Sequence, residues 1–174
     1  MRLGELVRAR RLPTWAELLT DARTMRIGLN LWPPYRFAGV RVEHIAADFS
    51  EAVVTLRLGF TTRNYVGTQF GGSLFSMTDP FWMLLVMNQL GPDYVVWDRV
   101  GEIEFVRPGR SDVRAQFRVD PAFVQELREA AADGAKVLRW VHTDIHDRQG
   151  QLVARVRRQL YVRRKPTGQR ATSR

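Results

Sequence analysis

The residues best suited to chemistry lie in one stretch, from Asn64 to Asp79, where a glycine-rich turn leads into an apolar segment with a single carboxylate. The adjacent Gly71 and Gly72 allow close backbone approaches, and a helix starting there would point its free N–H groups at a group lying over the turn. About two helical turns later, burial of Asp79 would make it a stronger base toward a bound water. Its apolar neighbours are Phe75, Met77, Phe81 and Trp82. The stretch is a candidate hydrolytic site.

Each of these residues also has a structural explanation. Asp79 precedes Pro80, and Asp followed by Pro is an ordinary helix start, so Asp79 could cap a second helical segment after a kink. Asn64 could position a reactant or simply satisfy a turn. The two glycines could supply an oxyanion N–H or allow tight helix packing. The sequence leaves both interpretations open.

The surrounding segments predict an α+β fold. Thr14 and Glu17 form a capping box, which predicts a helix from about residue 14 to the mid-twenties, and Trp32-Pro33-Pro34 should end anything helical. An extended segment is expected over 42–60, and an apolar central helix over 72–90. Four segments of period two follow, at 94–106, 112–119, 137–147 and 152–163, with a helix starting at Pro121 between the second and third. A curved antiparallel sheet wrapped around the central helix is the compact solution.

Composition narrows the function classes. The chain has 174 residues, which suits one domain, and no cysteine, which excludes disulfides and thiol nucleophiles and fits a cytoplasmic protein. The start of the sequence does not read as a signal peptide, and the longest apolar run is too short to span a membrane. The net charge is +9. Many of the arginines lie near the two ends of the sequence, and plain solvation there is favoured over a nucleic-acid surface, because the arginines are not interleaved with aromatics as in single-strand binders. A small phosphate-bearing ligand is an adequate anionic partner.

His142, Asp144 and His146 alternate along one predicted strand and so point the same way. Two imidazoles and a carboxylate could hold a metal, but ligands from one strand are seldom enough, and a solvated strand face is the favoured explanation. No serine lies in a nucleophile elbow, and no phosphate-binding loop is present. Neither a metal nor a cofactor is expected.

Several motifs of this chain resemble a hotdog-fold family, the DUF4442 proteins, over about residues 25–165. They are Leu31-Trp32-Pro33-Pro34, Asn64-Tyr65-Val66-Gly67-Thr68, Phe70-Gly71-Gly72-Ser73-Leu74, Thr78-Asp79-Pro80, Tyr94-Val95-Val96-Trp97-Asp98 and Phe105-Val106-Arg107-Pro108-Gly109-Arg110. The related PaaI-like and THEM-like acyl-CoA thioesterases have an Asn, a Gly and a His-Gly-Gly turn before a catalytic Asp. Asn64, Gly67, Gly71 and Asp79 match that pattern, and Phe70 replaces the His.

The resemblance implies a hotdog fold. With the N-terminal helix predicted from the capping box as an accessory element, the chain is expected to have three parts: residues 1–40 as that helix and a connector, 41–165 as the hotdog domain and 166–174 as a basic disordered tail. The resemblance also implies a homodimer or homotetramer with sites at the subunit interface, where Asp79 of one chain faces Asn64 and Gly71 of the other. The helix, apolar nearly all round, supports this, because one sheet cannot cover it completely.

The expected activity is hydrolysis of an acyl-CoA thioester. Asp79 would act as base or nucleophile, the Gly71 N–H would polarise the carbonyl and Asn64 would orient the reactants. Phe70 offers only packing or a wall for an acyl chain, which argues against a dehydratase that needs a catalytic His. The expected substrate-binding residues are Phe70, Gly72, Gln69, Ser73, Phe75, Arg107 and Arg110, with Arg99 a further candidate for the coenzyme A phosphates. A non-catalytic acyl-CoA carrier and, less favoured, a dimeric interaction module are the alternatives.

Overall fold

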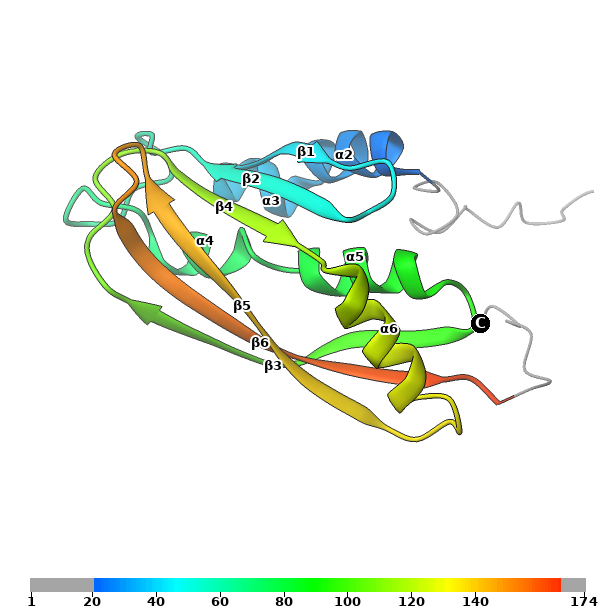
Figure 1. Ribbon diagram of the computed structural model, residues 1–174. Helices are drawn as coiled ribbons and strands as arrows, with labels where there is room; N and C mark the ends of the chain where they lie inside the picture. The colour runs from blue at the N-terminus through cyan, green and yellow to red at the C-terminus, as the bar shows by residue number, and fades with distance from the viewer. Residues whose placement is uncertain (1–20, 167–174) are drawn as a thin grey trace, which may run out of the picture.

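A single curved antiparallel sheet forms the body of the protein in the computed structural model, which describes residues 21–166 (Figure 1). The strand order is β1-β2-β4-β5-β6-β3. The strands are β1 (Val40–Ile45), β2 (Glu51–Leu56), β3 (Tyr94–Phe105), β4 (Val113–Arg118), β5 (Val137–Asp147) and β6 (Leu152–Arg164). The helices are α2 (Ala22–Leu31), α3 (Pro33–Ala38), α4 (Gly71–Ser76), α5 (Phe81–Leu90) and α6 (Pro121–Ala130).

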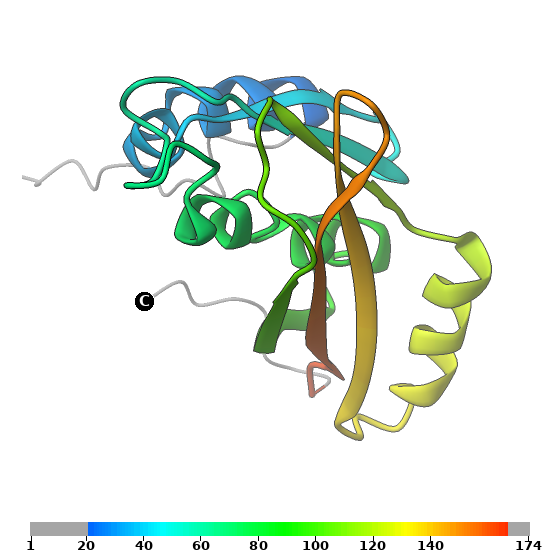
Figure 2. The ribbon, with the colours of Figure 1, turned by 90° about the vertical axis from the view of Figure 1, so that its left-hand side faces the viewer.

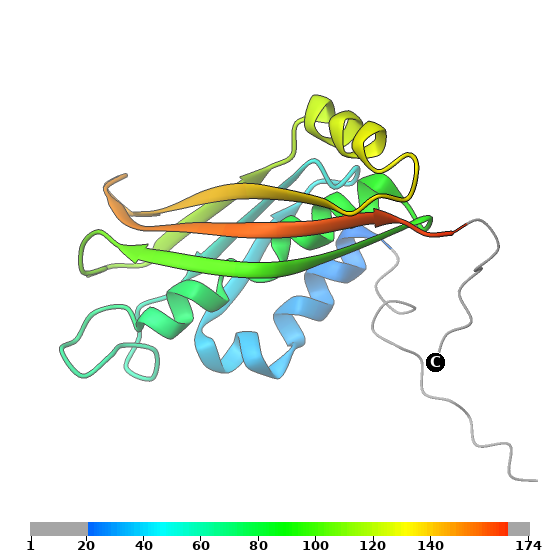
Figure 3. The same cartoon turned by 90° about the horizontal axis from the view of Figure 1, so that it is seen from below.

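The sheet curls around α4 and α5, which lie inside its curve (Figures 2 and 3). This is the predicted α+β arrangement with a central helix. Along β6 most inward positions are apolar and buried, as at Val156, Leu160 and Val162, whereas Arg155 and Arg157 face out. Strands β4 and β5 show a similar alternation, whereas the edge strand β3 is largely exposed with Val96 buried. Strands therefore lie at all four predicted segments of period two. Across residues 21–166, no helix has the length and apolar character needed to span a membrane.

The central helix covers residues 71–90 in two segments, α4 and α5. Pro80 lies between them, and proline interrupts a helix because it lacks the N–H and its ring crowds the preceding turn. Met77, Thr78, Asp79 and Pro80 therefore form a break in the helix, which places Asp79 in irregular backbone.

Two segment predictions were wrong in detail. The single extended segment over 42–60 is two strands, β1 and β2, because a turn at residues 46–50 separates them. In that turn the Ser50 N–H and hydroxyl both bond the Asp48 carboxylate, and Phe49 has a left-handed φ of 57°. Strand β2 ends at Leu56, so Phe60 lies outside the sheet and is exposed.

Trp32-Pro33-Pro34 was expected to end all helical structure. It does end α2, but Pro33 then starts α3, since proline is well suited to the first position of a helix. Residues 14–20 of the expected first helix lie outside the described residues, as does the tail from 167. The described part begins at an Asp21 capping box and continues to Leu31, past the predicted end in the mid-twenties.

The α2 and α3 helices pack beside β1 and reach the core (Figure 2). Helix α2 buries Met25 and Leu29. From α3, Tyr35 is buried and stacks on Phe81, with ring centroids 6.2 Å apart. Phe81 in turn stacks on Phe117 of β4 at 5.0 Å. An aromatic column thus joins α3, the start of α5 and the sheet.

Truncation of Phe81 is expected to destabilise the protein strongly. The side chain is 1% exposed, and Phe81→Ala would leave a cavity in the aromatic column. The expected loss is about 3–5 kcal/mol in the free energy of unfolding. Urea denaturation of the wild type and Phe81→Ala measures it, with Phe37→Ala as control, because Phe37 is 83% exposed. A loss below about 1 kcal/mol for Phe81→Ala would contradict this packing.

Candidate active site

The Asp79 carboxylate does not cap the helix that follows it. The N-cap of α5 is Pro80, and no side chain donates or accepts a capping hydrogen bond there. The capping explanation for Asp79 is therefore wrong. The expected desolvation of Asp79 is also absent within one chain, because its side chain is 58% exposed. Asp79 is an accessible carboxylate in the break of the central helix.

The backbone around Asp79 is held from several sides. The Asp79 N–H donates to the Ser76 carbonyl at 3.1 Å, and the Thr78 hydroxyl donates to the Phe75 carbonyl at 2.8 Å. The Tyr35 hydroxyl donates to the Asp79 carbonyl, and burial raises the pKa of Tyr35, so this donor stays protonated. Helix α3 thus fixes the backbone of the break through Tyr35 and leaves the Asp79 carboxylate accessible.

A buried arginine lies next to Asp79. Arg158 of β6 places Nη1 3.8 Å from Asp79 Oδ1 and 3.4 Å from Asp98 Oδ2 of β3. Neither Arg158 nor Asp98 is among the site residues predicted from the sequence. The sequence did hold a signal, because each residue occupies an inward position of its strand. Arg158 lies on the same face of β6 as Val156 and Leu160, and Asp98 lies on the same face of β3 as Val96. A charged residue at a core position of a strand indicates a polar site.

Asp98 is the desolvated carboxylate of this region. Its side chain is 14% exposed, and burial raises the pKa of Asp98 from its ordinary value of 3.8 to about 6. Arg158 opposes this rise in pKa, and the negative charge of Asp79 adds to it. The environment that was predicted for Asp79 is therefore found at Asp98.

Asp98 should make stability depend on pH. The folded chain binds the Asp98 proton more tightly than the unfolded chain, so its contribution is fully present below about pH 4 and is lost as pH rises through about 6. The shift in pKa corresponds to roughly 3 kcal/mol. Urea unfolding at pH 4.5 and pH 7.5 should show about two-thirds of this fall, roughly 2 kcal/mol, in the wild type and a smaller fall in Asp98→Asn. Equal pH dependence in the two proteins would contradict it.

The glycine turn starts the central helix. Gly71 is the first residue of α4, so its N–H has no acceptor within the helix. Phe70 precedes it with extended backbone, and its side chain is 54% exposed. A Cβ on Gly72 would lie 2.5 Å from the Phe70 ring, and one on Gly71 would lie 3.0 Å from Phe105. The glycines therefore allow close packing of two aromatic rings and also present a free N–H.

Asn64 and Gln69 hold the loop before the turn. The Asn64 amide accepts from the Thr68 N–H at 2.9 Å and donates to the Thr68 hydroxyl at 2.9 Å. Gln69 is buried, and its amide donates to the carbonyls of Leu56 and Ser111. In this chain both side chains serve the loop structure.

The other expected binding residues fall into separate places. Phe70, Gly72 and Ser73 share a hollow of about 430 Å³ with residues of α3 and of the loop after β2. Arg107 and Arg110 share a second hollow of about 600 Å³ on the loop after β3. Phe75 lies outside both hollows and packs under Arg158, whose guanidinium carbon is 4.6 Å from the ring centroid. Arg99 bonds Gln159 at 3.4 Å.

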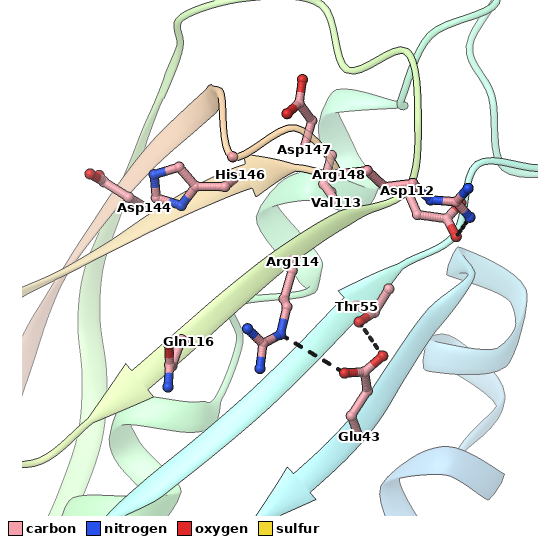
Figure 4. Close-up of a pocket in the computed structure, with 11 residues that line it drawn as sticks. Glu43, Thr55, Asp112, Val113, Arg114, Gln116, Asp144, His146, Asp147 and Arg148 are labelled. Atoms are coloured by element: carbon pink, nitrogen blue, oxygen red, sulfur yellow. Dashed lines mark hydrogen bonds and ion pairs between the residues drawn. The ribbon is translucent and has the colours of Figure 1, made fainter.

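A larger hollow of about 640 Å³ lies over β1, β2, β4 and the β5–β6 hairpin (Figure 4). Most of its charged groups are already engaged: Glu43 pairs with Arg114 and Asp112 with Arg148. The Asp147 carboxylate accepts from the N–H groups of Gln149 and Gln151. Asp144 at the edge of the hollow pairs with Arg155 at 3.0 Å. Among the described residues, no group of three His, Asp or Glu side chains could hold a metal, the set of His142, Asp144 and His146 included.

A family model described as Domain of unknown function (DUF4442) matches residues 21–162. The chain belongs to the DUF4442 family. No match to a curated protein was found. The resemblance inferred from the sequence motifs is thereby confirmed, and the matched residues include every element of the sheet apart from the end of β6.

Solved structures similar to this DUF4442 protein show its fold. PA5026 from Pseudomonas aeruginosa, a protein of unknown function, is 18% identical, with a TM-score of 0.73 over 82% of this chain and 95% of that one. The thioesterase HI1161 from Haemophilus influenzae is 15% identical (TM-score 0.58, 92% and 97% covered). PaaI from the phenylacetic acid degradation operon of E. coli is 20% identical (TM-score 0.58, 86% and 94% covered). This DUF4442 protein therefore has the hotdog fold.

Proposed function

We propose that this chain hydrolyses an acyl-CoA thioester, with Asp79 as the catalytic carboxylate. One observation carries the proposal: Asp79 is accessible in the break of the central helix, where it caps nothing and lies beside a buried arginine. An accessible carboxylate held in this way is suited to proton transfer. The fold shared with the thioesterase HI1161 and with PaaI supports the same class of reaction.

The chemistry requires a base and an oxyanion donor. Either Asp79 attacks the thioester carbonyl itself, or it takes a proton from a water whose oxygen attacks. In the second route, the new C–O bond forms a tetrahedral oxyanion, which the Gly71 N–H stabilises. The C–S bond then breaks, and the proton on Asp79 passes to the leaving sulfur. The products are a carboxylic acid and the free coenzyme A thiol.

Geometry favours a site made from two chains. Gly71 begins α4 and Asp79 lies in the break beyond its end, so at least the length of that six-residue helix, roughly 9 Å at 1.5 Å per residue, lies between them. One chain is therefore poorly placed to bring both groups to one carbonyl. β3 is a sheet edge of 12 residues, with Trp97, Val100 and Phe105 exposed along it. An open edge of this length is suited to pairing with a second copy. Phe105 also contacts Gly71, so the edge and the turn are adjacent.

In such a homodimer, Asp79 of one subunit would face the Gly71 turn of the other. Asn64 would act by fixing that turn, since its amide is bonded within the loop. Phe70, Gly72 and Ser73 would line the acyl end. Arg107 and Arg110 would meet the coenzyme A phosphates from the neighbouring hollow. Pairing of two dimers into a tetramer is compatible with this arrangement.

Phe70 supports a second candidate, a non-catalytic protein that binds an acyl-CoA or a similar ligand. The exposed Phe70 ring stands at the position of the His and offers apolar contact but no hydrogen bond. Such a protein would bind the ligand without hydrolysing it.

Free-thiol release from short, long and aromatic acyl-CoAs tests the proposal, and the chain contributes no background because it has no cysteine. Binding of the same compounds is measured in parallel by calorimetry. Turnover of at least one acyl class supports the hydrolase. Binding without turnover across the panel favours the carrier, and absence of both contradicts the two candidates together.

A further inference from the structure

Arg158 is the most deeply buried charged side chain next to the proposed site. It lies on the inner face of β6 and is 5% exposed. A guanidinium cannot lose its charge in a protein and presents five N–H donors in a planar fork. Burial of such a group is costly unless acceptors surround it. The groups that Arg158 contacts therefore indicate the role of this side chain.

The partners of Arg158 come from α4, from the helix break and from β3. Nη2 donates to the Phe75 carbonyl and to the Thr78 hydroxyl, each at 3.3 Å. Nη1 contacts the carboxylates of Asp98 and Asp79. Arg158 thus ties the end of α4 to the start of the break by hydrogen bonds and lies within ion-pair distance of the Asp79 carboxylate. The set couples β3 and β6 of the sheet to the central helix.

Gly101 leaves the space that this arrangement needs. It pairs with Arg158 across β3 and β6, and a Cβ there would lie 2.7 Å from the Phe75 ring and 3.3 Å from Arg158 Nη1. The Phe75 ring fills that space and covers the guanidinium. Arg158 is therefore enclosed by an aromatic face and four oxygen acceptors.

The two carboxylates on Arg158 differ in accessibility. Asp98 is 14% exposed and Asp79 is 58% exposed. Within residues 21–166, Asp98 Oδ1 and Arg158 Nε are buried and have no hydrogen-bond partner. One positive charge is thus shared between an inner and an outer carboxylate, which leaves the outer one only partly neutralised.

We propose that Arg158 is a positioning residue for Asp79, and that Asp98 competes for the charge of Arg158 so that Asp79 stays free to react. The inference rests on the proposed function, in which Asp79 acts on the thioester. Arg158 holds the carboxylate in one orientation when a bound acyl chain expels water from the site. Without Asp98, Arg158 would pair fully with Asp79, which would become a weaker base.

The first test measures how Arg158 and Asp79 each affect the pKa of Asp98, and it does not depend on activity. The charged groups facing Asp98 are Arg158 of β6 and Asp79 of the break, because α4 and α5 contain no charged residue. NMR titration of the Asp98 carboxyl carbon should give a pKa above about 6 in Arg158→Met and below about 6 in Asp79→Asn. An Asp98 titration that neither substitution moves would overturn the shared-charge arrangement.

The second test is kinetic. Arg158→Met should lower kcat by about 10- to 100-fold with little change in KM. A misplaced Asp79 carboxylate would stabilise the transition state less, whereas substrate binding does not depend on it. Arg158→Lys should recover part of kcat, since it restores the charge without the planar fork. Asp98→Asn should lower kcat by roughly tenfold, because Arg158 would then pair with Asp79 alone. An unchanged kcat in Arg158→Met, beside an active wild type, would overturn the positioning role.

The two proposals fail in different ways. If the Asp98 titration shifts as expected while the wild type turns over no acyl-CoA, the proposed function fails and the charge sharing is supported. If the wild type is active and the Asp98 titration is unmoved, the charge sharing is overturned and the function stands. Should Arg158→Met not fold, Asp79→Asn in the titration and Arg158→Lys in the assay give the same decisions.

Discussion

Asp79→Asn should lower kcat for acyl-CoA hydrolysis by about 100- to 10,000-fold, the range that a positioned acid or base contributes. Asparagine keeps the shape of the side chain but can neither accept the proton nor attack the carbonyl. KM and the affinity for the acyl-CoA should change little, since the proposed binding surfaces lie on other residues. Thiol release under saturating substrate, with calorimetric binding beside it, measures both quantities.

Asp93→Asn is the matched control for this substitution. Asp93 is exposed just before β3, away from the helix break, and its substitution removes the same charge. It should keep the kcat of the wild type. An Asp79→Asn protein with more than about a tenth of the wild-type kcat would show that another group supplies the base.

Gly71→Pro should lower kcat by about 100- to 1,000-fold, which is the effect of removing one oxyanion donor. Proline deletes the Gly71 N–H and is suited to the first position of α4. The preceding Phe70 already has extended backbone, with φ −69° and ψ 126°, as a residue before proline requires. The fold should therefore survive, and circular dichroism with thermal unfolding checks it.

Gly71→Ala separates the lost N–H from the added side chain. Both substitutions place a Cβ near the exposed Phe105 ring, which can move, but alanine keeps the N–H. Gly71→Ala should stay within a few-fold of the wild type. Equal losses in the two variants would mean that packing at this turn, and not the N–H, controls the rate.

The sequence was sufficient for the elements whose side chains alternate regularly. The bounds of β5, Val137–Asp147, agree with the prediction, because one face of that strand is buried and the other is solvated. It was insufficient where local turn chemistry interrupts an apolar pattern. The Asp48–Ser50 turn splits the segment over 42–60, and Pro33 starts a helix where a stop was predicted.

The candidate site was predicted only in part. The glycine turn and the break at Asp79 are both visible in the motif from Asn64 to Asp79. The association of Asp79 with Arg158 and Asp98 is not, because it depends on the register of β3 against β6. That register shifts between Asp98 and Val100, where Arg99 is an extra residue, and no periodicity in the sequence reveals such a shift. The charged residues at inward positions of β3 and β6, Asp98 and Arg158, were the signal of this cluster in the sequence.

A heterodimer of Asp79→Asn and Gly71→Pro subunits tests the central claim most directly, that one subunit's carboxylate acts on a thioester polarised by the other's turn. The two chains are co-expressed with different affinity tags and purified through both. Each variant alone should be nearly inactive. In the heterodimer, one of the two composite sites keeps both Asp79 and the Gly71 N–H, so about half of the wild-type kcat per dimer should return. A heterodimer as inactive as its parents would contradict the account.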